Sequence, residues 1–455
     1  MTRATLAAAL ALALAAAALP LRAQAPQRPF GTVREQADRQ QRWLQERMDR
    51  HLPALMRRYG VDMWVMPMRE YNEDPVFRAL VAPTTFAARR RTIYVFFDRG
   101  PAQGVERLAL GGTSQGGVYS AYRSARPVTA PVAGRQAELW GDEQWALLRQ
   151  VIEERNPARI AVNVSRTFAF ADGLTAGEYD GMRAALGPAL AARLVTADGL
   201  PVDFLAVRTD DERAFFRELV AFNWALIDEM FSNRVVTPGV TRTSDLVWWY
   251  RQRLADAGLG TWFQPSVSVQ RRGVRPEQLG DDPVIERGDV LWCDVGITAL
   301  GLNTDIQHVG YVLRDGETAV PAGLVRALQR TNRLQDIVME EIRPGRTGNE
   351  ILLASRERMD AERLLGTVYS HPIGLHGHGA GPLIGLWDLQ DGVAGRGDHR
   401  VLPETWFSIE LQVTSPVEEW GGQWVRIAQE EDMVIGAGGT PEWAHRRQTG
   451  FHVVR

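Results

Sequence analysis

The sequence predicts an α+β protein in which a smaller α/β domain precedes a larger domain built around β-hairpins. Helical and strand patterns alternate between residues 38 and 164, as they do in layered α/β domains. After residue 290, apolar runs of strand length occur in pairs around turn residues, which is typical of antiparallel hairpins. The length of 455 residues is sufficient for about two or three domains.

The first domain is expected at residues 26–205. An apolar stripe at helical spacing predicts a helix over 38–59, which Pro53 can kink. The remaining elements expected from apolar periodicity are strands at 61–66, 91–97 and 159–164 and a helix at 143–154.

The second domain is expected at residues 206–455, after a connection at 201–210. An aromatic stripe at helical spacing predicts a long helix over 211–234, and those aromatic side chains are assigned to the core. A further helix is expected over 244–257, where Thr243-Ser-Asp provides a cap.

Residues 1–25 have the three parts of a secretory signal peptide. A basic start precedes an Ala/Leu run that ends at Leu19, and Ala23 and Ala25 form a small-residue cleavage site. We therefore expect cleavage after Ala25, a periplasmic or secreted protein, and no stable membrane anchor once the signal is removed. The single cysteine, Cys293, excludes an intramolecular disulfide. The net charge of −3 gives no reason to expect binding to nucleic acid.

Two pairs of carboxylates lie in the two predicted hairpins of the second domain. Asp294 and Asp305 are equidistant from a turn centred between residues 299 and 300, and Glu410 and Glu431 from a turn centred between 420 and 421. Residues equidistant from a hairpin turn face each other with Cβ atoms about 5 Å apart. Because like charges in such positions repel, each pair predicts a positive partner.

Divalent metal ions are the partner that balances these charges. Two ions about 3.5 to 4 Å apart would carry four positive charges against the four carboxylates, with a neutral histidine as the fifth ligand. Carboxylate-rich ligand sets favour Mn, and imidazole also accepts Zn. We therefore expect two divalent ions, Mn, Co or Zn.

The choice between the neighbours Glu430 and Glu431 depends on strand alternation. Residues in phase with Glu431 are mainly apolar, whereas those in phase with Glu430 include Arg426 and Asp432. A buried carboxylate is costly unless it is paired or coordinated. The pattern therefore selects Glu431 as the ligand and Glu430 as a solvated surface charge. The histidine is expected in the segment 370–381, where the residues alone leave His371, His376 and His378 open.

These residues resemble, in order and spacing, the site of the pita-bread metallopeptidases of family M24. The motifs that carry the resemblance are Cys293-Asp-Val-Gly, Asp305, the His-rich segment, Ser408-Ile-Glu410 and Glu430-Glu431-Asp. The family includes Xaa-Pro aminopeptidases, prolidases and methionine aminopeptidases. The resemblance covers residues 206–445 and implies a curved antiparallel sheet covered by helices. The upstream segment is similar to a creatinase/prolidase-type N-terminal domain.

The resemblance also implies roles for individual residues. His371-Pro-Ile-Gly-Leu-His-Gly-His378 matches a family pattern in which the first histidine binds metal and the second lies in the substrate site. His371 then joins Asp294, Asp305, Glu410 and Glu431 as a ligand, and Glu410 and His378 are the expected catalytic residues. The other register, with His378 as the ligand, stays open, and His376 is assigned to a loop.

Three features depart from the family pattern. Gly379 follows His378 where peptidases of the family usually have an acid, and Gln307 and His308 replace the common Thr and Arg after Asp305. The histidine that usually precedes the first aspartate is also missing, and the candidates to replace it as a donor are Gln270, Arg271 and His308.

The sequence thus predicts a secreted binuclear-metal hydrolase that resembles Xaa-Pro aminopeptidases and dipeptidases. A hydroxide that bridges the ions would attack the polarised carbonyl of the N-terminal bond of a short peptide. Two alternatives stay open: hydrolysis of a non-peptide C–N bond as in creatinase, and a catalytically silent binding protein on the same scaffold. A homodimer is compatible with the sequence.

Overall fold

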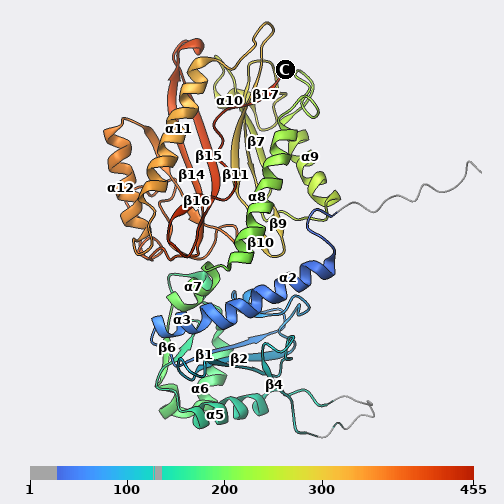
Figure 1. Ribbon diagram of the computed structural model, residues 1–455, viewed down its shortest axis with the longest axis vertical. Coiled ribbons are helices and arrows are strands. Elements are labelled where there is room, and N and C mark those ends of the chain that lie inside the picture. Colours follow the sequence, from blue (N-terminus) through green and yellow to red (C-terminus); the bar gives the residue numbers. More distant parts are fainter. Residues whose placement is uncertain (1–27, 127, 129–135) are drawn as a thin grey trace, which may run out of the picture.

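A computed structural model describes residues 28–126, 128 and 136–455 and shows two domains one above the other (Figure 1). The predicted signal peptide, 1–25, and its cleavage site after Ala25 lie outside the described residues. Among the residues described, no helix combines the length and the apolar composition needed to cross a membrane.

The first domain is a six-stranded sheet covered by helices on both faces. Its strand order is β4-β3-β2-β1-β5-β6. Alternate residues of the central strand β1 (Met63–Arg69) face opposite layers: Trp64 and Met66 pack with the N-terminal helices, whereas Met63 and Val65 pack with α5 and α6. The other strands are β2 (Arg91–Asp98), β3 (Val105–Leu110), β4 (Ser120–Tyr122), β5 (Ile160–Val162) and β6 (Leu194–Thr196), and the covering helices include α5 (Asp142–Arg155) and α6 (Ala176–Ala191).

The helix predicted over 38–59 is present but longer and divided. It consists of α2 (Val33–Glu46), one wider turn (Arg47–His51) and α3 (Leu52–Arg58). A capping box between Thr32 and Glu35 begins it earlier than predicted. Pro53, which has no backbone N–H to donate, lies in the first turn of α3, directly after the wider turn.

The junction between the domains is helical. Most of the connection predicted at 201–210 is α7 (Gly199–Ala206), and a capping box of Thr209 with Glu212 then begins α8 (Asp210–Met230). Helix α2 lies along the same junction (Figure 1). Two adjacent residues of α2 pack into different domains: Trp43 belongs to the core of the second domain and Leu44 to that of the first.

The second domain is a nine-stranded sheet with helices packed against it, which confirms the predicted α+β class. The central strand order is β12-β14-β15-β11-β8-β7. The strands are β7 (Ser266–Gln270), β8 (Val290–Val295), β11 (Ile306–Val312), β12 (Leu365–Val368), β13 (His371–Pro372), β14 (Trp406–Val417), β15 (Gln423–Ile435), β16 (Pro441–Trp443) and β17 (His452–Val454), and the helices include α8, α9 (Thr243–Asp256), α11 (Ala322–Glu341) and α12 (Gly348–Ala361).

Both predicted hairpins form, but the predicted register of each is wrong. In the first, Asp294 pairs with Gln307 rather than Asp305, because the turn consists of Leu300 and Gly301, both with positive φ. In the second, Glu410 pairs with Glu430, because a five-residue loop separates the paired ends of β14 and β15. A shift of one residue reverses the face of a strand on which a side chain lies.

Candidate metal centre

Four carboxylates and one histidine converge on one face of the second domain's sheet. Their side chains form overlapping groups whose nitrogen and oxygen atoms lie within 4.8 Å of one another. The carboxylate cluster consists of Asp294 from β8, Asp305 directly before β11, His371 from β13, Glu410 from β14 and Glu430 from β15. A third group brings His378 together with Asp305 and His371, so the alternative in which His378 is a ligand stays open.

The sheet topology explains why these residues meet. Strands β14, β15, β11 and β8 are consecutive neighbours, and β13 pairs with β14 so that His371 lies opposite Ser408. Side chains alternate between the two faces along each strand, and paired residues on neighbouring strands point to the same face. Residues separated by more than 100 positions in the sequence therefore meet over the middle of the sheet.

His371 has the orientation of a metal ligand. Its Nδ1 lies 3.0 Å from the carbonyl oxygen of Pro372, which can only accept, so Nδ1 donates. In the neutral ring Nε2 is then an acceptor, yet it lies 3.2 Å from Glu430 Oε1 and 3.6 Å from Asp305 Oδ2. Acceptors that face one another at these distances require a proton or a cation between them.

The carboxylates of the cluster also lack partners of opposite charge. Asp294 Oδ1 and Asp305 Oδ1 are buried and accept no hydrogen bond from the residues described. Burial, together with the charge of Glu430, raises the pKa of Asp294 to about 8. Burial also raises the pKa of Glu430 to about 7, although hydrogen bonds from Ser408 and Gln307 oppose the shift. This donor set fits divalent cations, which replace the missing protons and satisfy the free oxygens.

The prediction that Glu431 joins the cluster and Glu430 is solvated is wrong. Glu430 is 1% exposed and belongs to two of the three ligand groups. Glu431 is also buried, but it points to the opposite face, where it accepts hydrogen bonds from Trp224 Nε1 at 3.1 Å and Gln448 N at 2.7 Å. The apolar residues in phase with Glu431 pack against α11, so they mark the helix-covered face rather than the face with the cluster.

Glu431 belongs to a separate hydrogen-bonded chain behind the sheet. Its Oε1 lies 3.0 Å from His308 Nε2, and His308 Nδ1 lies 3.0 Å from His452 Nε2. His452 Nδ1 in turn lies 3.0 Å from Asp228 Oδ1 of α8. The chain connects β15, β11, β17 and α8, so Glu431 is a structural residue.

Gln307 lies among the carboxylates. Its Nε2 donates to Glu410 Oε1 at 2.7 Å and to Glu430 Oε2 at 2.9 Å, and it lies 3.4 Å from Asp294 Oδ2. The sequence analysis placed Gln307 only in the neighbourhood of Asp305. The pairing of β8 with β11 puts Gln307 opposite Asp294, and its amide therefore lies inside the cluster.

A family comparison assigns this domain. Residues 215–437 match the model described as Metallopeptidase family M24. The chain carries an M24 metallopeptidase domain. This match confirms the predicted family and the predicted class of enzyme, a metal-dependent peptidase. Because the match begins at residue 215, the creatinase/prolidase type assigned to the first domain stays a prediction. A comparison with curated protein sequences finds no match.

Solved structures share the fold across both domains. The X-Pro aminopeptidase from Thermotoga maritima is 18% identical with a TM-score of 0.60, over 88% of this chain and 100% of that chain. The Xaa-Pro dipeptidase from Bacillus anthracis is 18% identical with a TM-score of 0.56, over 93% and 100%. The N-terminal domain of FACT complex subunit SPT16 from chickpea (Cicer arietinum) is 12% identical with a TM-score of 0.55, over 91% and 99%. At these identities the likeness shows the fold alone, and it confirms the predicted pita-bread domain.

His378 lies beside the cluster of the M24 domain. Its ring centroid is 4.7 Å from that of His371, and its Nε2 is 3.4 Å from the hydroxyl of Tyr369. Partial burial, together with the charge of Arg396, lowers the pKa of His378 to about 4, so the ring is neutral near pH 7. His376 lies apart from the carboxylates, with its ring 4.7 Å from that of Phe170.

None of the three candidates for the missing donor reaches the cluster. Gln270 exchanges two hydrogen bonds with the backbone of Arg426, Arg271 pairs with Asp289 at 2.8 Å, and His308 contacts Glu431 behind the sheet. The groups that do lie near His378 are the Tyr369 hydroxyl and the half-buried Arg396, whose guanidinium has no ion-pair partner among the described residues. No spacing in the sequence connects Arg396 with the cluster, because it lies in a long loop.

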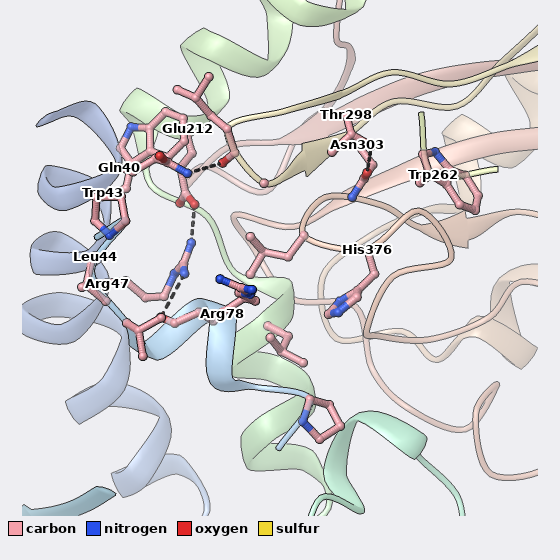
Figure 2. A pocket seen from close by; sticks show the side chains of 18 of the residues that line it. Gln40, Trp43, Leu44, Arg47, Arg78, Glu212, Trp262, Thr298, Asn303 and His376 are labelled. Atoms are coloured by element: carbon pink, nitrogen blue, oxygen red, sulfur yellow. Dashed lines mark hydrogen bonds and ion pairs between the residues drawn. The ribbon is translucent and has the colours of Figure 1, made fainter. Parts of the chain in front are cut away.

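Two cavities with no lining residue in common lie at the M24 centre. A cavity of about 280 Å³ is lined by Asp294, Gln307, Tyr369 and Glu410. A larger cleft of about 950 Å³ between the two domains is lined in part by His376 and His378 (Figure 2). Two carboxylates of the cluster line the smaller cavity, and the larger one is lined by His378, whose ring lies beside that of His371.

Proposed function

We propose that the chain is a metal-dependent exopeptidase that cleaves the N-terminal bond of short peptides, as an Xaa-Pro aminopeptidase or dipeptidase does. The observation that carries the proposal is the short distance between two acceptor atoms, His371 Nε2 and Glu430 Oε1, within a set of buried carboxylates. Such an arrangement favours a bound cation. The names of the structural neighbours from Thermotoga maritima and Bacillus anthracis support the Xaa-Pro specificity.

We propose Asp294, Asp305, His371, Glu410 and Glu430 as the ligands. The groups Asp294–Asp305–Glu430 and His371–Glu410–Glu430 share Glu430 and offer two positions, which supports the expectation of two ions. The predicted ions stay Mn, Co or Zn. When bound, such ions act as Lewis acids and lower the pKa of bound water toward neutrality.

Glu410 is the carboxylate suited to move a proton during hydrolysis. It lines the smaller cavity and keeps 21% of its side chain accessible. Burial and the charge of Glu430 raise its pKa well above the usual range. The carboxylate oxygen of Glu410 can therefore accept a proton from the attacking water and then donate it to the leaving amine. His378, neutral and beside the Tyr369 hydroxyl, can donate to the oxygen on which charge develops.

The smaller cavity supports the choice of an exopeptidase. Its volume of about 280 Å³ is near the lower limit of about 300 Å³ for ligand pockets. On its wall the carboxylates of Asp294 and Glu410 outnumber the single guanidinium of Arg426, so the net charge complements that of a free α-amino group. The cavity therefore suits the first residue of a peptide.

One observation favours the alternative of a binding protein without catalysis. The Gln307 amide donates hydrogen bonds to Glu410 and Glu430. These hydrogen bonds occupy carboxylate oxygens that a metal ion would coordinate, so the amide can weaken metal binding. Metal content and peptide turnover together distinguish the two functions, because a silent protein can hold ions without cleaving a peptide.

The test combines elemental analysis of the purified protein with a panel of Xaa-Pro dipeptides, proline-second oligopeptides, Met-initiated peptides and creatine. We expect stoichiometric divalent metal and metal-dependent turnover of proline-second peptides, and we expect Glu410→Gln to lose this turnover. Arg183→Gln, an exposed substitution on α6, is the control. Protein without metal contradicts the hydrolase. Metal without turnover of any peptide favours the binding protein, and turnover of creatine alone favours the non-peptide hydrolase.

A further inference from the structure

The interdomain cleft lies between α2, the segment that follows β1, and loops of the M24 domain. Figure 2 shows Trp43 and Leu44 on one side of the cleft, and Trp262 and His376 on the other. Its volume of about 950 Å³ is near the upper limit of about 1,000 Å³ for sites that bind organic ligands. The metal centre described above does not explain a cavity of this size.

The walls of the cleft are predominantly apolar. They include Trp43, Leu44, Val81, Phe86, Phe170 and Leu375. Phe86 is 76% exposed, although burial of an aromatic ring from water is favourable by about 25 cal/mol per Å². The exposed ring and its apolar neighbours therefore favour a ligand with an apolar body.

The charges of the cleft favour a ligand with an anionic end. Arg47 and Glu212 form a buried ion pair and neutralise each other. Arg78 is exposed, lines the cleft, and has no ion-pair partner in the part of the chain that the structure describes. Its guanidinium lies 5.7 Å from the ring of its neighbour Phe77. A guanidinium group without a charged partner can pair with a carboxylate through two parallel hydrogen bonds.

His378 connects the cleft with the metal centre. It lines the cleft, and its ring is 4.7 Å from that of His371 and 5.2 Å from that of Trp262. On the wall of the smaller cavity two carboxylates, Asp294 and Glu410, outnumber one guanidinium, Arg426, whereas on the wall of the large apolar cleft two guanidinium groups outnumber the carboxylate of Glu212. This polarity matches a peptide, which has an amino group at one end and a carboxylate at the other.

We propose that the interdomain cleft binds the C-terminal part of the peptide substrate, with apolar side chains against its walls and the terminal carboxylate paired with Arg78. The inference rests on the proposed exopeptidase function. It deepens that function, because it specifies oligopeptides with apolar residues after the cleaved bond and a free C-terminus.

The test uses proline-second peptides of two to six residues with leucine and phenylalanine at their C-terminal ends, each as the free acid and as the C-terminal amide. The metal-loaded full-length protein is compared with Arg78→Gln, Phe86→Ala and the control Arg183→Gln. Arg183 is a matched control because it too is exposed, lies 5.4 Å from the ring of a nearby tyrosine, and forms no ion pair among the described residues.

For wild type, amidation should raise KM about tenfold once the peptide is long enough to reach Arg78, with little change in kcat. Arg78→Gln should raise the KM of the acid to that of the amide, whereas Arg183→Gln should behave as wild type. Phe86→Ala should raise KM for acid and amide alike. An acid preference that survives in Arg78→Gln overturns the inference.

Equilibrium binding of the same peptides separates this inference from the proposed function. If the wild-type protein cleaves no peptide but binds the acids about tenfold more tightly than the amides through Arg78, the exopeptidase proposal fails and the cleft stands as a site for peptide carboxylates. If binding does not distinguish acid from amide, the cleft inference fails whether or not the protein is a peptidase.

Discussion

Glu430 and Glu431 are neighbours in sequence and both are buried, so the pair of variants Glu430→Gln and Glu431→Gln tests the register of β15 directly. Each substitution preserves the shape of the side chain and removes its charge. Glu430 belongs to two ligand groups, whereas Glu431 accepts hydrogen bonds from Trp224 and Gln448 and contacts His308 on the opposite face. The two variants should therefore fail in different measurements.

The expected magnitudes follow from these contacts. Loss of outer partners of a metal site typically weakens binding by about 10- to 100-fold, and Glu430→Gln removes a direct ligand, so its metal affinity should fall by more. Its metal-free form should be about as stable as the wild type, because removal of one of several buried like charges offsets the weakened hydrogen bonds from Ser408 and Gln307. Glu431→Gln places an amide NH₂ against donors and should cost about 1 to 3 kcal/mol of folding free energy, or several degrees in Tm at about 2 to 4 °C per kcal/mol.

The assay is titration calorimetry with Mn²⁺, together with thermal unfolding of metal-free and metal-loaded protein. Glu430→Gln should lose metal and retain its metal-free Tm, and Glu431→Gln should retain metal and lose Tm in both forms. If Glu431→Gln lowers metal content as much as Glu430→Gln does, the register and the ligand assignment are both refuted.

Four other predictions concern the same protein. His371→Ala should remove metal, whereas His378→Ala should retain it and lower kcat; equal metal loss would make both histidines ligands. Gln307→Thr should tighten metal binding by removing the amide from the cluster, whereas the control Gln429→Thr, which affects a buried glutamine bonded to Gln448, should not; weaker binding in Gln307→Thr would show that the amide supports the site. In metal-free protein, two cluster carboxyls have pKa values raised from 3.8 and 4.5 to about 8 and about 7, so the folded state binds protons more tightly than the unfolded state and the free energy of unfolding should fall as pH rises from about 4 to about 8. Metal should abolish that fall, and a metal-free Tm that rises over this range would contradict it. N-terminal sequencing of exported protein should begin at Pro26, and retention of the first residues would contradict cleavage after Ala25.

The sequence by itself determined the parts of the fold that depend on local pattern. Apolar periodicity located helices α5 and α8 and strands β1 and β2 to within a few residues, because each element buries one face or one stripe of its own sequence. The acids of the two predicted hairpins pointed to Asp294, Asp305 and Glu410 as ligands, although the facing pairs predicted from hairpin symmetry were wrong. The family pattern then pointed to His371, which the structure places beside them.

Only the tertiary structure decided which of two adjacent glutamates faces the cluster. Both faces of β15 are buried, one by the carboxylates and the other by helices, so alternation of polarity could not distinguish Glu430 from Glu431. The register depends on one residue in a loop, and a shift of one residue reverses every side chain of the strand. The placement of Gln307 among the carboxylates and of Arg78 in the interdomain cleft depends on contacts between segments that are distant in sequence. Local patterns determine each element, and long-range packing determines which side chains meet.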